Sequence, residues 1–282
     1  QPPIRHLSSV GLFLAMHCST LHRVLVLGLG LAFGFALPVL AQRTCAEAKQ
    51  IHHPSGAKGG NGAVVLAPVD ILHQRIELDL TQGNIIRGAC AIKLTPRLAT
   101  LASFDLNLEA LSVDSITTAT GPWTFVHNGT TLSITPSSEL TPTDTVRFTV
   151  HYHGDPVVDP SGFGGFYTSA ALTYNLGVAF QSVPHSYGRT WFPCLDDFNE
   201  RSIYSFFVRT AGGRKAWCNG SLVERIPLDG DTLINHWECV GDMPAYLVSV
   251  AAANYAELHD SLATIGGGSI PVTLVAAPSV TA

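Results

Sequence analysis

The sequence predicts an all-β fold, an antiparallel saddle or sandwich of short strands. From residue 69 onward, most of the chain alternates apolar and polar residues with a period of two. Turn-forming pairs such as Asn128-Gly129 separate the alternating runs. No stretch of four helical turns carries apolar residues at three- and four-residue spacing. Many short strands with no amphipathic helix favour a β-sheet assembly over a mixed fold.

The first expected element is an antiparallel hairpin with one buried face. Its strands cover residues 74–80 and 86–94, and the turn 81–84 joins them. In both strands the even-numbered positions are mostly apolar, whereas charged side chains occupy odd-numbered positions. Because successive side chains point to opposite faces of a strand, this pattern places the apolar residues together.

Further strands are expected along the chain by the same alternation. Asn128-Gly129 is a strong signal for a tight hairpin turn between two of them. The expected strands cover residues 104–108, 123–127, 131–135, 146–152, 203–210, 221–226, 232–239, 246–252 and 270–275.

An apolar run at residues 24–41 sets the N-terminal part of the chain apart. It follows Arg23 and closes with Val39–Ala41, which is typical of a secretory signal peptide with its start at Met16. A membrane anchor is the alternative, but the run contains three glycines and Pro38 and ends in a cleavage site. We expect an exported protein, periplasmic or secreted and bacterial, with no stable membrane span after cleavage.

Three parts of the chain follow from this interpretation. Residues 1–41 are the signal peptide, with untranslated upstream sequence at 1–15, and residues 42–68 are a flexible glycine-rich tail. Residues 69–282 form one β-sheet domain, in which Gly266–Gly268 is a loop rather than a boundary.

The low content of charged residues bears on the partners of the chain. Charged residues make up 13% of the chain and the net charge is −5, which excludes the basic stripe that nucleic acid requires.

A chain cut after Ala41 keeps an odd number of cysteines, so at least one thiol is free. Cys218 and Cys239 flank the turn Asp229–Asp231 and are expected to form a disulfide across a hairpin. The alternative is that all the cysteines after Ala41 are free and act as small buried apolar residues.

The sequence contains no motif that would hold a metal or a nucleophile. No His is followed by Glu, which excludes the H-E-x-x-H zinc helix, and C-x-x-C and G-x-S-x-G are also absent. His151 and His153 share a strand face with Arg147 and are expected to face solvent, and His52-His53 in the tail is a weaker metal candidate. We therefore assign no catalytic residue and no metal ligand to this chain.

Two further motifs have structural explanations. Gly162–Gly165 looks like a phosphate loop, but a strand follows it, so its glycines are expected to allow close backbone approach or positive φ angles. Asp196 and Asp197 are adjacent carboxylates, and we expect them to accept backbone N–H bonds in a turn. Trp191 and Phe192 are expected to pack in the core.

The order and spacing of several motifs carry a resemblance over residues 69–282. These motifs are Asp70–Leu80, Ile86–Gly88, Val150–Gly154, Gly164–Tyr167, Gln181, Arg189–Asp196, Asn219-Gly220 and Asp242–Ala252. Together they resemble the N-terminal domain of zinc aminopeptidases of the aminopeptidase N and leukotriene hydrolase type, in the gluzincin family. Ile270–Val275 resembles the last strand before the catalytic domain of that family.

The resemblance implies a saddle of β-sheets that caps a separate catalytic domain, where H-E-x-x-H and a later Glu hold zinc. It implies that the full-length protein is a zinc metallopeptidase that hydrolyses peptide bonds, and that this fragment alone is inactive. The implied partners are the protein's own C-terminal catalytic domain and a peptide substrate. We expect an apolar docking surface for that domain near Gln181 and Phe166.

The resemblance also assigns substrate binding to a short loop. Family members carry Gln at the position of Gln181 and Glu at the position of Val183, where the carboxylate helps to hold the α-ammonium group of the substrate. Valine carries no charge, so this loop departs from the family in the recognition of a free amine. The alternative function is a secreted, non-catalytic β-sandwich that binds a peptide or a glycan; a stop codon after Ala282 would favour it, and an encoded H-E-x-x-H would favour the enzyme.

Overall fold

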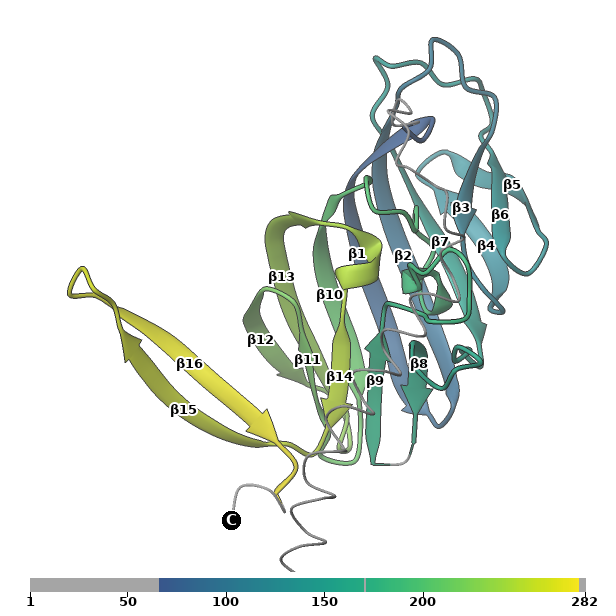
Figure 1. The fold of residues 1–282 in the computed structure, drawn as a ribbon. Helices are drawn as coiled ribbons and strands as arrows, with labels where there is room; N and C mark the ends of the chain where they lie inside the picture. The colour runs from purple at the N-terminus through teal and green to yellow at the C-terminus, as the bar shows by residue number, and fades with distance from the viewer. Residues whose placement is uncertain (1–65, 170, 279–282) are drawn as a thin grey trace, which may run out of the picture. The chain divides into compact units, whose positions relative to one another are not determined.

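The computed structural model describes residues 66–169 and 171–278, and most of them lie in β-strands (Figure 1). The two remaining regular elements in these ranges are short 3-10 helices, η1 (Gly188–Thr190) and η2 (Ala245–Leu247). The predicted all-β fold is therefore confirmed. The predicted signal peptide at 1–41 and nearly all of the predicted tail at 42–68 lie outside the described residues. None of the helices within the described residues is long and apolar enough to cross a membrane.

Ten strands form the larger sheet, in the order β12-β13-β10-β1-β2-β7-β4-β5-β6-β3. Their bounds are β1 (Val69–Gln82), β2 (Ile85–Pro96), β3 (Phe104–Asn107), β4 (Ser112–Thr118), β5 (Gly121–His127), β6 (Thr131–Thr135), β7 (Val146–Gly154), β10 (Ser202–Thr210), β12 (Ser221–Pro227) and β13 (Leu233–Met243).

Four strands form a second sheet, in the order β11-β14-β9-β8, and two more form a hairpin of their own. Their bounds are β8 (Gly165–Thr168), β9 (Leu172–Leu176), β11 (Lys215–Cys218), β14 (Val250–Ala253), β15 (Ala256–Ala263) and β16 (Ser269–Ala276).

The first predicted hairpin is present as β1 and β2, with the expected face buried. Ile76 lies opposite Cys90 and Leu78 lies opposite Gly88, and the apolar members of these pairs are buried. The register follows from the alternation, because a slip by one residue would turn every apolar side chain to the other face. The hairpin of β5 and β6 at Asn128-Gly129 is also present.

One pair of neighbours in the larger sheet departs from the antiparallel pattern. Strand β10 lies parallel to β1, with His73 opposite Ile203 and Asp79 opposite Arg209. The long segment between β1 and β10 builds most of the rest of the sheet and returns the chain in the same direction.

Buried side chains of the two larger sheets belong to a single core cluster, which includes Phe206 of β10 and Ala252 of β14. Trp191 and Phe192, on the segment after η1, are fully buried, as expected. The ring of Trp191 lies 5.9 Å from that of Phe166 on β8, and the ring of Phe192 lies 6.2 Å from that of Tyr204 on β10. This aromatic segment therefore connects the two sheets through the core.

Two details of the sequence interpretation were wrong. The strand expected at 246–252 begins only at Val250, because the preceding residues form η2 and the side chain of Asn175 hydrogen bonds to Val248 O and Val250 N. The expected disulfide is also absent, since Cys218 and Cys239 are free thiols. The turn around Gly230 joins β12 to β13, whereas Cys218 lies on β11 of the other sheet.

One face of the hairpin of β15 and β16 exposes four large apolar side chains, with exposed Asp260 between Leu258 and Leu262 on the same face. Leu258 lies opposite Leu274, and Leu262 lies opposite Ile270. These four side chains are all more than half exposed.

Candidate functional site

The loop that contains Gln181 and Val183 follows β9 and is closed by backbone contacts at its base. Val178 forms a β-bridge with Ser186, and Ala179 N donates to His185 O at 2.8 Å. The side chain of Gln181 is exposed, and Val183 is 76% exposed. The structure thus places both predicted substrate-binding residues at the solvent-facing tip of one loop.

Asp159, in the connection between β7 and β8, binds the backbone of this loop. Its carboxylate accepts hydrogen bonds from the backbone N–H groups of Phe180, Gln181 and Ser182 at 3.3, 3.1 and 2.7 Å. It also accepts bonds from the hydroxyl groups of Ser182 and Ser161 and from Ser161 N. Burial alone would raise the pKa of Asp159, but these donors outweigh it and hold the pKa below its usual range.

Apolar side chains surround the loop. Phe163 and Phe180 stack with ring centroids 4.5 Å apart and an interplanar angle of 9°, and both rings are partly exposed. Val178, at the base of the loop, and Val158, next to Asp159 in the sequence, are also exposed. Phe166 itself is buried in the core, so the exposed apolar surface lies around Gln181 rather than over Phe166.

The glycines of 162–165 act as expected. Gly162, Gly164 and Gly165 have positive φ angles of 74°, 102° and 107°. A Cβ atom on Gly164 would lie 2.3 Å from Val178 O, so only glycine permits this approach of the two segments.

A largely buried ion network follows the loop in the sequence. Arg189 Nε lies 2.7 Å from Glu109 Oε2, and Arg189 Nη1 lies 3.1 Å from Asp196 Oδ2. Burial raises the pKa of Asp196, although hydrogen bonds and charge from Arg189 oppose the shift. Asp196 accepts Arg189 N, and Asp197 accepts Asn199 N and Glu200 N, so both carboxylates have the expected turn role.

The histidines considered as metal ligands lie apart from any such cluster. His151 Nε2 lies 3.2 Å from Thr117 Oγ1, and His153 Nδ1 lies 2.8 Å from Asp114 Oδ1. Within residues 66–169 and 171–278, no group of three His, Cys, Asp or Glu side chains is placed to hold a metal ion. His52 and His53 lie outside these ranges.

Sequence reasoning missed a polar chain across three strands. His73 Nε2 lies 2.8 Å from Ser205 Oγ, which donates to Glu238 at 2.7 Å, and Glu238 contacts His236 Nε2 at 2.8 Å. The Ser205 hydroxyl is buried and its proton points to the carboxylate, so it is not placed as a nucleophile. These side chains meet only because their strands pair, so no local sequence pattern identifies the hydrogen-bonded group.

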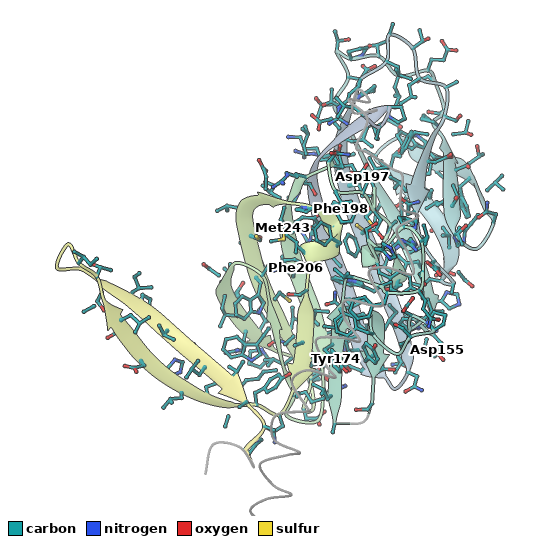
Figure 2. All side chains as sticks on the ribbon, in the orientation of Figure 1. Asp155, Tyr174, Asp197, Phe198, Phe206 and Met243 are labelled. Atoms are coloured by element: carbon teal, nitrogen blue, oxygen red, sulfur yellow. The ribbon has the colours of Figure 1, made fainter. Side chains whose placement is uncertain are left out.

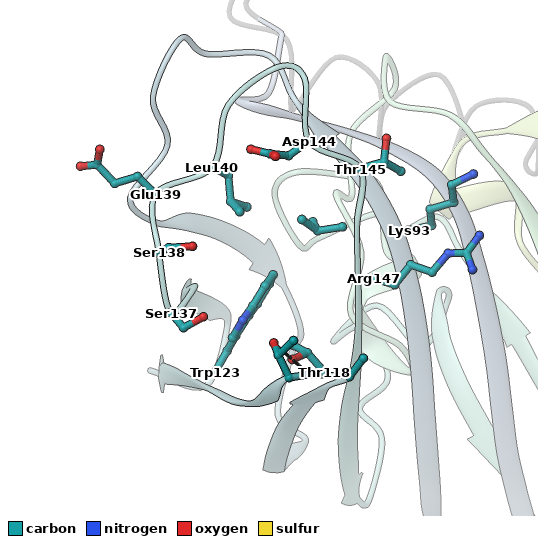
Figure 3. A pocket seen from close by; sticks show the side chains of 13 residues that line it. Lys93, Thr118, Trp123, Ser137, Ser138, Glu139, Leu140, Asp144, Thr145 and Arg147 are labelled. Atoms are coloured by element: carbon teal, nitrogen blue, oxygen red, sulfur yellow. Dashed lines mark hydrogen bonds between the residues drawn. The ribbon is translucent and has the colours of Figure 1, made fainter.

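A cavity of about 700 Å³ lies elsewhere, between the segment 137–147 and the neighbouring strands (Figure 3). Trp123 lines one side, and Lys93 and Arg147, which lie opposite each other on β2 and β7, line the other. The side chain of Asp144 binds Thr141 N and so closes its own loop. Among the described residues that line this cavity, there is no acid–base pair and no nucleophile with a base.

Comparisons with known proteins identify the fold. No family model matches the sequence, and no curated protein matches it. The M1 zinc metallopeptidase from Deinococcus radiodurans has a TM-score of 0.64 and 17% identity, over 74% of this chain and 47% of that chain. A mutant of that enzyme bound to a Tyr-Ser-Ala substrate gives a TM-score of 0.64 at 18% identity, over the same shares of both chains.

Legionella pneumophila aminopeptidase A in complex with aspartic acid has a TM-score of 0.63 and 16% identity, over 77% of this chain and 25% of that chain. The chain therefore spans about half the length of the Deinococcus enzyme and a quarter of the Legionella enzyme. Over about three quarters of its length, the chain has the all-β fold of the N-terminal domain of M1 zinc metallopeptidases.

Proposed function

We propose that this chain is the N-terminal, substrate-facing domain of an exported zinc-dependent aminopeptidase-like protein, which hydrolyses peptide bonds in its full-length form. The observation that carries the proposal is the fold match, in which three quarters of this chain superimpose on about half of a zinc metallopeptidase. The other half of that length is the place for a catalytic domain, which is the proposed partner of this chain.

The proposed zinc site belongs to that catalytic domain. The described residues of this chain do not fit zinc, because they bring no three ligands together and zinc sites in proteins require three or four. The fragment alone is therefore proposed to be inactive.

The Gln181 loop is the proposed contact with substrate. An exposed Gln side chain can both donate to and accept from a peptide backbone. Val183 is also exposed and carries no charge, so the loop offers a bound peptide an amide and an apolar contact rather than a partner for an ammonium group.

Two exposed apolar surfaces support the proposed docking of a second domain. One consists of Phe163, Phe180 and Val183 around the loop, and the other of the four exposed apolar side chains on one face of β15 and β16. Clustered exposed apolar side chains mark interaction surfaces more often than isolated ones do. The proposed export, to the periplasm or the medium of a bacterium, relies on the apolar segment at 24–41.

The test compares the full-length gene product with residues 42–282. We expect about one zinc per full-length chain and hydrolysis of aminoacyl substrates, and neither property in the shorter chain. Stoichiometric zinc on residues 42–282 would contradict the proposal. A full-length product that has no zinc and does not cleave peptides would instead favour a non-catalytic module that binds a peptide or a glycan.

A further inference from the structure

We propose that Asp159 is a positioning residue, which fixes the backbone of residues 180–182 so that Gln181 and Val183 face a bound peptide. This inference rests on the proposed function, in which the Gln181 loop contacts substrate. It adds a residue that lies outside the loop and acts only through it.

Three successive backbone amides converge on one carboxylate. Ser182 N donates to Asp159 Oδ1 at 2.7 Å, and Gln181 N and Phe180 N donate to Oδ2 at 3.1 and 3.3 Å. Consecutive amides that point to one centre form a concave anion-binding arrangement, and here the anion is a side chain of the same protein. A movement of these residues away from Asp159 therefore breaks hydrogen bonds to its carboxylate.

The carboxylate is buried without a cation. Asp159 is 2% exposed, and no ion pair in the described residues includes it. A buried carboxylate is costly unless hydrogen bonds satisfy it, and here amides and serine hydroxyls supply them. The lowered pKa of Asp159 keeps the group ionised at neutral pH, so the anchor persists.

The connection that carries Asp159 is itself held against the loop. Gly162 N donates to Asp159 O at 2.8 Å, and Asp159 N donates to Gly164 O at 3.0 Å. Phe163 stacks on Phe180, and Gly164 passes close to Val178 O. The segment on both sides of the Asp159 carboxylate is therefore held by its own hydrogen bonds and contacts.

The ordered residues are exposed, which points to recognition rather than to core packing. Phe180, Gln181 and Val183 all project toward solvent. Fixing their backbone adds little buried apolar area, but it reduces the conformational entropy that the loop would otherwise lose when a ligand binds. A binding loop gains most from such preorganisation when its support is a buried group beneath it.

The test uses Asp159→Asn, with Asp155→Asn as the matched control. Asp155 is exposed and lies four residues earlier (Figure 2), so its substitution makes the same chemical change without touching the loop. We expect the amides of Phe180, Gln181 and Ser182 to exchange with deuterium at least about tenfold faster in Asp159→Asn than in wild type, as the loss of about one hydrogen bond to a charged group predicts. Exchange at Phe206 in the core and throughout the control should not change. Unchanged exchange at the three amides would overturn the role of Asp159.

A measurement on the wild-type chain covers the case in which Asp159→Asn does not fold. NMR scalar couplings across the hydrogen bonds should connect the Asp159 carboxylate carbon to the amide nitrogens of Gln181 and Ser182. If the couplings are absent and these amides exchange at solvent rates, the anchor does not exist.

A kinetic readout separates this inference from the proposed function. In the full-length protein we expect Asp159→Asn to raise KM for a peptide roughly tenfold with kcat little changed, because the loop acts in binding, and Asp155→Asn to change neither. If exchange is faster but KM is unchanged, Asp159 orders the loop but the loop does not contact the substrate. The proposed function of the loop then fails, and the positioning role of Asp159 in substrate binding fails with it.

Discussion

Gly88 on β2 lies directly opposite Tyr152 on β7, and the tyrosine ring covers the position where a side chain of Gly88 would stand. A Cβ atom on Gly88 would lie 2.1 Å from Tyr152 Cζ and 2.3 Å from its hydroxyl oxygen. Tyr152 is buried and belongs to the core cluster, so other core side chains surround its ring. Glycine is therefore required here for the space above the ring rather than for an unusual backbone angle.

Gly88→Ala is expected to lower the free energy of unfolding by about 1–3 kcal/mol, because the added methyl group overpacks a filled site. Urea denaturation of residues 42–282 measures it. Gly241→Ala is the matched control, since a Cβ atom added there would meet no atom of the described residues within 4 Å and its φ is not positive. Equal stability of the two variants would show that the Tyr152 ring has room to shift.

Arg189→Met is expected to destabilise the chain by about 3–5 kcal/mol, because it removes the cation that compensates buried Asp196. Thermal or urea unfolding measures the loss. Arg87→Met is the control, since Arg87 is exposed and no ion pair in the described part of the chain includes it; a change within about 0.5 kcal/mol is expected. A loss at Arg189 no larger than that of the control would mean that the network contributes little to stability.

Strand positions could be predicted from the sequence because alternation is a local property. Ile76 and Leu78 could be assigned to a buried face without knowing which strand lies beside them. Strand order could not be predicted in this way: the parallel pairing of β1 with β10 joins segments that are far apart in the sequence. The disulfide prediction failed for the same reason, since it assumed that Cys218 lies on the hairpin with Cys239, whereas it lies on another sheet.

The candidate site could be predicted only at the positions that a resemblance marks. Gln181 and Val183 are such positions, and the structure places them on one exposed loop. Asp159 could not be found, because Asp159-Pro160-Ser161-Gly162 has the composition of an ordinary turn and the bonds to residues 180–182 come from tertiary structure. A carboxylate in a turn reveals such a role only when its burial is known.

The hairpin of β15 and β16 provides a pH-dependent prediction through Glu257. Its carboxylate lies 2.7 Å from Lys215 Nζ, and this hydrogen bond, opposed by burial, lowers the pKa of Glu257 from 4.5. A group whose pKa is lower in the folded state than in the unfolded state stabilises the fold at pH values above its unfolded-state pKa. This stabilisation is lost as the pH falls through the folded-state pKa. Glu257→Gln should therefore cost about 1 kcal/mol at pH 7 and less at pH 3, as measured by urea unfolding.

Glu77→Gln is the control for that comparison, because Glu77 is about half exposed and, within the described residues, forms an ion pair only with exposed Arg75. Its effect should stay within about 0.5 kcal/mol at both pH values. A Glu257→Gln effect that grows on acidification would contradict the assigned direction.

Val183→Glu in the full-length protein tests whether the loop tip meets the amino end of a substrate. Val183 is exposed, so a carboxylate there needs no burial, and the neighbouring backbone remains anchored through Ser182 to Asp159. A charge-assisted bond to an α-ammonium group contributes about 1.5–3 kcal/mol, so kcat/KM for a peptide with a free amine should rise about tenfold or more relative to its N-acetylated form. Val126→Glu, at an exposed position of strand β5, introduces the same charge away from the loop and should leave that ratio unchanged. If Val183→Glu also leaves the ratio unchanged, the amino end of the substrate does not reach this loop, because an exposed carboxylate within reach of an ammonium group would favour the free amine.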